Sequence, residues 1–175
     1  IDDRFILSVN GEIYNHRALY TTALHNKYKP VTQSDCEVII YLYKEFGIQG
    51  VKMLDGIFSF VLYDKEENKI FIARDPIGII PLYYGITNNN EFMVASEMKS
   101  LTDDCVFINT FTPGSYIHLS HNVDKYHCKE EVNNSIEKYY NPTWDNIDFI
   151  NYQENELLYE TIRNSLTDAV DKRLM

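Results

Sequence analysis

Positive charge and cysteine are both scarce in this sequence, and each shortage excludes a class of function. The 175-residue chain has 16 Lys and Arg against 26 Asp and Glu, a formal net charge of −10. Nucleic acids and anionic membranes need a positive protein face, so this balance argues against both as partners. The three cysteines, Cys36, Cys105 and Cys128, are scattered without metal-ligand spacing. An odd, sparse set predicts a reducing, cytoplasmic setting rather than a disulfide framework.

Long apolar runs and a signal peptide are also missing. No run approaches the roughly 20 apolar residues that a membrane-spanning helix needs, which predicts no membrane partner. Apolar residues still make up 45% of the chain, too many for a disordered protein and enough for one domain with a core. Because the chain begins at Ile1 and ends at Met175 inside a predicted helix, we expect a fragment of a longer protein.

Apolar periodicity predicts a mixed α+β fold. The run Phe5–Val9 is typical of a buried strand that ends in an Asn-Gly turn, and residues 15–26 have helical spacing. A second helix should begin near Ser34, because Ser34 and Glu37 have the spacing of a capping box, and should end at Gly47. Further strands are predicted at 57–63, 69–73, 82–86, 92–96 and 115–119, with a short helix at 97–101.

The composition changes after residue 120. Residues 121–152 are polar and rich in Asn, Lys and Tyr, which is typical of a linker or a wrapping segment. Residues 153–175 predict an amphipathic helix with one apolar stripe. The stripe consists of Leu158, Ile162, Leu166, Val170 and Leu174. We therefore expect a domain at 1–120, a linker at 121–152, and a final helix that packs against a following domain.

The pair Asn10-Gly11 allows two interpretations. Asn-Gly at a strand end is most often only a turn. Alternatively, the Asn10 amide and a neighbouring backbone N–H converge on one oxygen and form the oxyanion hole of an acyl-transfer site. Removing one such donor costs roughly 2.7–4 kcal/mol in acyl-transfer enzymes. Spacing alone leaves both interpretations open.

Acidic residues supply the other candidates. Asp35 lies at a predicted helix start, where the helix dipole favours a carboxylate, or it lies in a cleft and holds the ammonium of a ligand; Glu12 could act in the same way. The Pro- and Gly-containing segment 74–83 predicts a shaped turn in which Arg74 and Asp75 form a buried ion pair. The five histidines are dispersed, so no metal site is assigned.

Five segments resemble one family in family order. They are Asn-Gly-Glu-Ile-Tyr-Asn at 10–15, Ser-Asp-Cys-Glu-Val-Ile at 34–39, Leu-Asp-Gly-Ile-Phe-Ser-Phe at 54–60, Arg-Asp-Pro-Ile-Gly-Ile-Ile-Pro-Leu-Tyr-Tyr-Gly at 74–85, and Ala-Ser-Glu-Met-Lys-Ser-Leu at 95–101. They resemble the glutaminase half of glutamine-dependent asparagine synthetase, a class II amidotransferase of the N-terminal-nucleophile type. The resemblance implies a four-layer αββα sandwich with mainly antiparallel sheets, incomplete at the N-terminus.

The resemblance also implies roles for individual residues. Asn10 and Gly11 would form the oxyanion hole for glutamine hydrolysis and contact the glutamine. Glu12 and Asp35 would bind the α-amino group of glutamine, since a carboxylate pairs with an ammonium. Ile57 would lie near the start of the ammonia tunnel of the family.

Other parts of the family's machinery are expected outside residues 1–175. The nucleophile is an N-terminal Cys whose α-amino group is the base, so the segment alone is expected to lack glutaminase activity. ATP and Mg would act in a synthetase domain of the same polypeptide, and residues 153–175 would be its first helix. Glutamine and that domain are the implied partners, and a homodimer is left open. Two alternatives remain: another class II amidotransferase, or a non-catalytic domain of the same fold.

Overall fold

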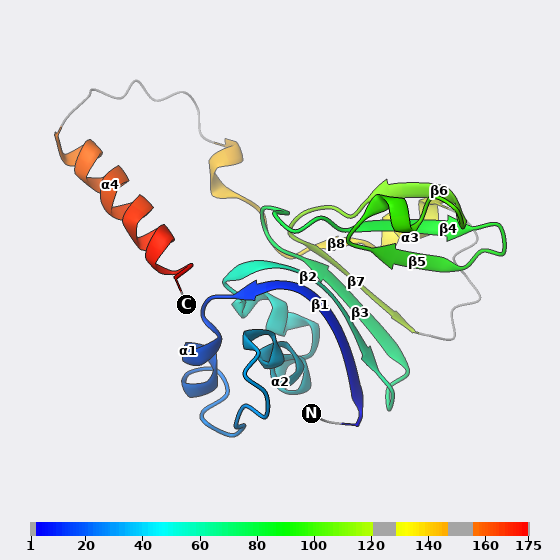
Figure 1. The fold of residues 1–175 in the computed structure, drawn as a ribbon, viewed down its shortest axis with the longest axis horizontal. Coiled ribbons are helices and arrows are strands. Elements are labelled where there is room, and N and C mark those ends of the chain that lie inside the picture. The colour runs from blue at the N-terminus through cyan, green and yellow to red at the C-terminus, as the bar shows by residue number, and fades with distance from the viewer. Residues whose placement is uncertain (1–2, 121–128, 147–155, 175) are drawn as a thin grey trace. The chain divides into compact units, whose positions relative to one another are not determined.

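The computed structural model describes residues 3–120, 129–146 and 156–174, which divide into a unit at 1–140 and a unit at 141–175 (Figure 1). The described part of the first unit contains eight strands: β1 (Phe5–Ile13), β2 (Gly56–Asp64), β3 (Lys69–Arg74), β4 (Tyr83–Thr87), β5 (Phe92–Ala95), β6 (Cys105–Thr110), β7 (Ser115–Ser120) and β8 (Glu137–Lys138). Its helices are α1 (His16–Thr21), α2 (Val38–Phe46), α3 (Lys129–Ser135) and the 3-10 helices η1 (Asp35–Glu37), η2 (Gly47–Met53) and η3 (Met98–Ser100). The second unit contains η4 (Thr143–Asn146) and α4 (Glu156–Asp171).

Two antiparallel sheets form the frame of the first unit. Sheet A has the strand order β1-β2-β3-β7-β8, and sheet B has the order β5-β4-β6. Strands β1 and β2 pair over their full length, from Phe5 opposite Asp64 to Ile13 opposite Gly56. Strand β1 lies at the edge of sheet A, so the groups on its outer side need partners other than a strand.

Sheet A is covered on both faces. Phe58, Phe60 and Leu62 of β2 belong to a core shared with α1 and α2, whereas Ile72 and Ile117 belong to a second core shared with sheet B. Helices α1 and α2 therefore lie on one face of sheet A, and sheet B lies on the other (Figure 1). Every strand pair within the described residues is antiparallel, and the predicted α+β class with mainly antiparallel sheets is confirmed.

Two predicted elements of the first unit differ from the structure by more than two residues. Strand β1 continues through Asn10-Gly11 to Ile13, so the turn predicted at Asn-Gly is wrong. Helix α1 covers only His16–Thr21 of the predicted 15–26. The rest of that segment forms turns, in which His25 and Asn26 have positive φ. The Asn15 side chain does not cap α1 and instead donates to the Met53 carbonyl at 2.9 Å.

Part of the predicted linker folds onto the first unit. Strand β8 pairs with β7, placing Ser115 opposite Lys138, and α3 contributes Val132 to the second core. The Tyr139 hydroxyl also donates to the Arg74 carbonyl at 2.8 Å. The two limits of the predicted linker and Cys128 lie outside the described residues. Residues 129–140 thus pack against β7 and the second core as part of the first unit.

The predicted C-terminal helix is present as α4. Four residues of its predicted stripe, Ile162, Leu166, Val170 and Leu174, are between 49% and 74% exposed. No helix in the described part of the chain is both long enough and apolar enough to cross a membrane.

Candidate active site

Strand β1 carries the predicted oxyanion pair, Asn10 and Gly11. Asn10 lies opposite Ser59 and has an exposed side chain. Gly11 lies opposite Phe58 with φ of +145°, and a Cβ there would lie 2.1 Å from the Ile57 carbonyl oxygen. Such a distance is far inside van der Waals contact, so no residue with a side chain fits at Gly11.

A second glycine makes the corresponding close approach from β2. A Cβ at Gly56 would lie 2.2 Å from the Glu12 carbonyl oxygen. Glu12 itself is exposed and lies opposite the half-buried Ile57. Glycine on both strands therefore lets β1 and β2 approach closely where β1 carries the candidate residues.

The outer edge of β1 is closed by η1 rather than by another strand. The Ile13 amide donates to Asp35 Oδ2 at 2.5 Å, and the Cys36 thiol donates to the Gly11 carbonyl at 3.5 Å. These contacts bring Asp35 to the segment that carries Asn10, Gly11 and Glu12. The Oδ1 atom of Asp35 has no hydrogen bond to any described residue, so one carboxylate oxygen is available to a ligand.

The start of the helical segment depends on Ser34 as expected, but Glu37 acts differently from the prediction. Ser34 Oγ accepts the Cys36 amide at 3.3 Å, as an N-cap does. In a capping box the Glu37 carboxylate would accept the Ser34 amide. That amide instead donates to Thr32 Oγ1 at 3.1 Å, and Glu37 reaches back to the amides of Val31 and Thr32 at 2.7 and 2.6 Å.

Glu37 is a buried carboxylate, with only 2% of its surface exposed. Burial raises the pKa of a carboxyl group, but the Thr32 hydroxyl, the amides of Val31 and Thr32 and the Tyr41 hydroxyl outweigh burial and hold the pKa of Glu37 below its usual value. Glu37 is therefore charged at neutral pH.

The turn after β3 is organised by Arg74 and Asp75 through backbone groups. Arg74 donates from Nε to the Ile80 carbonyl, from Nη1 to the Phe111 carbonyl and from Nη2 to the Gly78 carbonyl, at 2.7–2.8 Å. The prediction of an Arg74–Asp75 ion pair is wrong, because the Arg74 guanidinium donates to backbone carbonyls and the Asp75 carboxylate accepts from backbone amides.

Asp75 connects this turn to the strand opposite the candidate site. Its carboxylate accepts the amides of residues 77–80 at 2.6–3.1 Å and the Phe58 amide at 3.3 Å. Its own amide donates to the Phe58 carbonyl at 2.8 Å. Because Phe58 lies opposite Gly11, the turn fixes β2 at the position opposite the candidate pair Asn10-Gly11.

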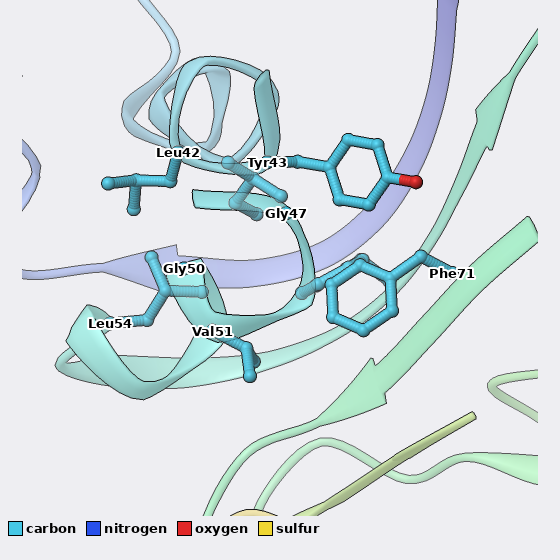
Figure 2. A pocket seen from close by; sticks show the side chains of 9 residues that line it. Leu42, Tyr43, Gly47, Gly50, Val51, Leu54 and Phe71 are labelled. Atoms are coloured by element: carbon cyan, nitrogen blue, oxygen red, sulfur yellow. The ribbon is translucent and has the colours of Figure 1, made fainter. Parts of the chain in front are cut away.

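An open hollow of about 440 Å³ lies beside the loop that precedes Asp35. It is lined by His16, Arg17 and Tyr20 of α1 and by Pro30 and residues 32–34 of the loop. A second cavity, between α2, η2 and sheet A, measures only about 10 Å³ and is lined by residues that include Leu42, Tyr43 and Phe71 (Figure 2). It has room for at most one water molecule and is a packing gap rather than a ligand site.

Neither Cys36 nor Cys105, the two cysteines in the described part of the chain, is activated as a nucleophile. Burial and the neighbouring Asp35 carboxylate raise the pKa of the Cys36 thiol to about 12. Burial and the charge of Asp104 also raise the pKa of Cys105. The thiolate is the nucleophilic form, so both groups are unreactive at neutral pH. Among the residues that the structure describes, no three His, Cys, Asp or Glu side chains are grouped to hold a metal ion.

Comparison with known proteins identifies the family. The sequence profile of the glutamine amidotransferase domain matches residues 1–148. The chain belongs to the glutamine amidotransferase domain family. The match includes Asn10–Glu12 and Asp35, the residues that the structure brings together, and extends past β8 into residues outside the predicted domain at 1–120.

Relatives of this amidotransferase domain include plant and yeast enzymes. The chain is 40% identical over 174 residues to asparagine synthetase [glutamine-hydrolyzing] 1 of Arabidopsis thaliana, covering 99% of the chain and 27% of that protein. It is 42% identical over 176 residues to a probable asparagine synthetase [glutamine-hydrolyzing] of Schizosaccharomyces pombe, covering 99% and 29%. The predicted resemblance is confirmed, and the chain spans less than a third of these relatives.

A solved structure supports the fold of the amidotransferase domain independently. Glutamine phosphoribosylpyrophosphate amidotransferase from B. subtilis superimposes with a TM-score of 0.58 at 23% identity, covering 66% of the chain and 27% of the other protein. This likeness confirms the predicted α+β fold.

Proposed function

We propose that this chain is the glutaminase part of a glutamine-hydrolysing asparagine synthetase. One observation carries the proposal: η1 closes the edge of β1 and brings Asp35, with a free carboxylate oxygen, to the segment Asn10–Glu12. Amide donors and two carboxylates in one place suit a ligand with an amide carbonyl at one end and an ammonium at the other. Glutamine has both groups.

In the proposed reaction a thiolate supplied from outside residues 1–175 attacks the side-chain amide of glutamine. The carbonyl oxygen becomes an oxyanion, which the Asn10 amide and the backbone at Gly11 stabilise as hydrogen-bond donors. The α-amino group that took the proton of the thiol passes it to the amide nitrogen as the C–N bond breaks, so ammonia leaves and a thioester remains. Water then cleaves the thioester, which releases glutamate and regenerates the thiol. Asp35 and Glu12 hold the α-ammonium throughout, which fixes the distance between the substrate backbone and the reacting carbon.

The remaining parts of the proposal concern the whole protein. Ammonia would pass to an aspartate that ATP and Mg activate in a synthetase domain of the same polypeptide, and no residue of this chain is assigned to ATP or Mg. Residues 153–175 would be the first helix of that domain, and the protein would act in the cytoplasm.

The proposal is tested by Asp35→Asn in the full-length gene product. Loss of the charge on the ammonium partner should raise the KM for glutamine about tenfold to a hundredfold. Asparagine formation from free ammonia should stay unchanged, because it bypasses glutamine. Asp103→Asn, which neutralises an exposed carboxylate outside the site, is the matched control. A wild-type KM for glutamine in Asp35→Asn would contradict the proposal.

A further inference from the structure

The loop before Asp35 is held in place by one buried side chain. Residues 31–34 are exposed, and Val31 is 69% exposed, so packing does little to fix them. Glu37 Oε1 accepts the Val31 amide at 2.7 Å, and Oε2 accepts both the amide and the hydroxyl of Thr32 at 2.6 Å. Each of these bonds restrains a loop that has no buried apolar anchor of its own.

The restraint continues along the loop to both sides of Asp35. Thr32 Oγ1, held by Glu37, accepts the Ser34 amide at 3.1 Å, and Ser34 Oγ accepts the Cys36 amide at 3.3 Å. Asp35 lies between these two anchored residues, with Oδ2 on the Ile13 amide. A shift of the loop would therefore move the carboxylate relative to β1.

Glu37 has no cationic partner within the described residues, so its charge is balanced only by hydrogen-bond donors. The fourth donor is the Tyr41 hydroxyl, at 2.9 Å from Oε1 and one helical turn further along. Leaving a buried charge without its donors is costly. The folded protein therefore favours the single loop arrangement in which the donors of Val31 and Thr32 point at Glu37.

We infer that Glu37 is a positioning residue for glutamine binding: it holds the loop at 31–34 so that Asp35 keeps Oδ1 directed to the substrate ammonium. This inference rests on the proposed function of Asp35. Glu37 does not contact the substrate and acts through the loop, so its loss should weaken glutamine binding without changing the chemical step.

The test replaces Glu37 by Gln in the full-length gene product. The amide NH2 cannot accept a hydrogen bond, so at least one loop donor loses its partner. We expect the KM for glutamine to rise about tenfold while kcat for glutamate release stays within about twofold, and ammonia-dependent asparagine formation to stay at the wild-type rate.

A second, milder variant keeps the test valid if Glu37→Gln fails to fold. Thr32→Val removes only the hydroxyl that donates to Glu37 and accepts from Ser34, and its KM should rise about threefold with an unchanged kcat. Ile86→Ala, in the core between the sheets, is the control for general loosening and should lower the melting temperature without changing KM.

Three outcomes would overturn the inference. The first is a wild-type KM in both Glu37→Gln and Thr32→Val, and the second is a KM rise in Ile86→Ala as large as that in Glu37→Gln. The third is a loss of kcat at unchanged KM. Asp35→Asn, measured in parallel, separates the two claims: if it raises KM while Glu37→Gln does not, only the role of Glu37 is wrong. If Asp35→Asn has no effect, the proposed function itself fails.

Discussion

Cys36 lies beside the residue proposed to bind the oxyanion, yet its environment keeps it protonated. The thiol is buried, donates to the Gly11 carbonyl and lies 3.7 Å from Asp35 Oδ2. A negative charge on sulfur would be disfavoured by both burial and the adjacent carboxylate. Position in a family motif therefore does not make this cysteine a nucleophile, and it acts as a packing group and a donor to the edge of β1.

We predict that Cys36 resists alkylation in the native protein. With its pKa raised to about 12, almost no thiolate is present at neutral pH. Iodoacetamide at pH 7.5 should label the peptide that contains Cys36 only after denaturation, as measured by mass spectrometry. Rapid labelling of the folded protein, with protection by glutamine, would show instead that Cys36 is an exposed and reactive part of the site.

At the scale of elements, the turn at 75–80 depends on a single carboxylate. Asp75 is 1% exposed and accepts the amides of four consecutive turn residues as well as that of Phe58. Asn at this position keeps one acceptor oxygen and introduces a donor, so several buried amides would lose their partner.

We predict that Asp75→Asn loosens this turn more than any other element. Each buried amide left unsatisfied costs about 1–3 kcal/mol. Amide hydrogen exchange in peptides covering residues 74–82 should accelerate at least tenfold, while peptides from α2 should change less. Asp103→Asn, which replaces an exposed carboxylate, provides the baseline. Equal exchange rates of residues 74–82 in the two variants would contradict the assigned role of Asp75.

Most elements of the fold follow from local sequence signals. The hairpin of β2 and β3 and the pair β4 and β5 were predicted within one or two residues, because apolar runs and polar connections mark them directly. Gly47 ends α2 as predicted, with φ of 58°. Strand β6 was missed, since it follows a polar stretch, and the two-residue β8 exists only through its pairing with β7.

The site was less predictable than the fold. Family resemblance placed Asn10, Gly11, Glu12 and Asp35 in one function, but only the structure shows how η1 joins them. Glu37 has the spacing of a capping box, and that spacing is the same whether it binds Ser34 or reaches back to the loop. The partners that decided between the two, Val31, Thr32 and Tyr41, lie only four to six residues away, but no spacing rule marks a carboxylate that reaches back into the preceding loop.

At the scale of the whole molecule, buried carboxylates make stability depend on acid. Asp64 is fully buried; burial opposes its ionisation, but Arg4 and the amides of Glu67 and Glu66 outweigh burial and lower its pKa. The pKa of Glu37 is lowered as well. A carboxyl group whose pKa is lowered by folding stabilises the protein at any pH above the pKa that it has in the unfolded chain, which is about 4. That stability is lost as the pH falls through the pKa of the folded state.

We predict that the first unit loses stability steeply below about pH 4. Amide exchange of β2 and β3 peptides, followed from pH 7 to pH 3 with correction for intrinsic rates, should report this loss. Asp64→Asn should be less stable than wild type at pH 7 but should show a shallower dependence on pH, because one of the linked carboxylates is gone. An unchanged slope in Asp64→Asn would contradict the role assigned to the Arg4–Asp64 pair.

Gly11 and Gly56, which allow β1 and β2 to approach closely, also constrain how this sequence can evolve. Alanine at Gly11 and alanine at Gly56 would each force the same two strands apart at neighbouring positions. Once one substitution has opened the gap, the other meets less resistance, so their costs are coupled and fall short of additive. The coupling is one-sided, because Gly11 also has a φ of +145°, which residues with a side chain rarely adopt. A lineage that loses Gly11 loses much of the constraint that retains Gly56, whereas Gly11 stays constrained after Gly56 is lost.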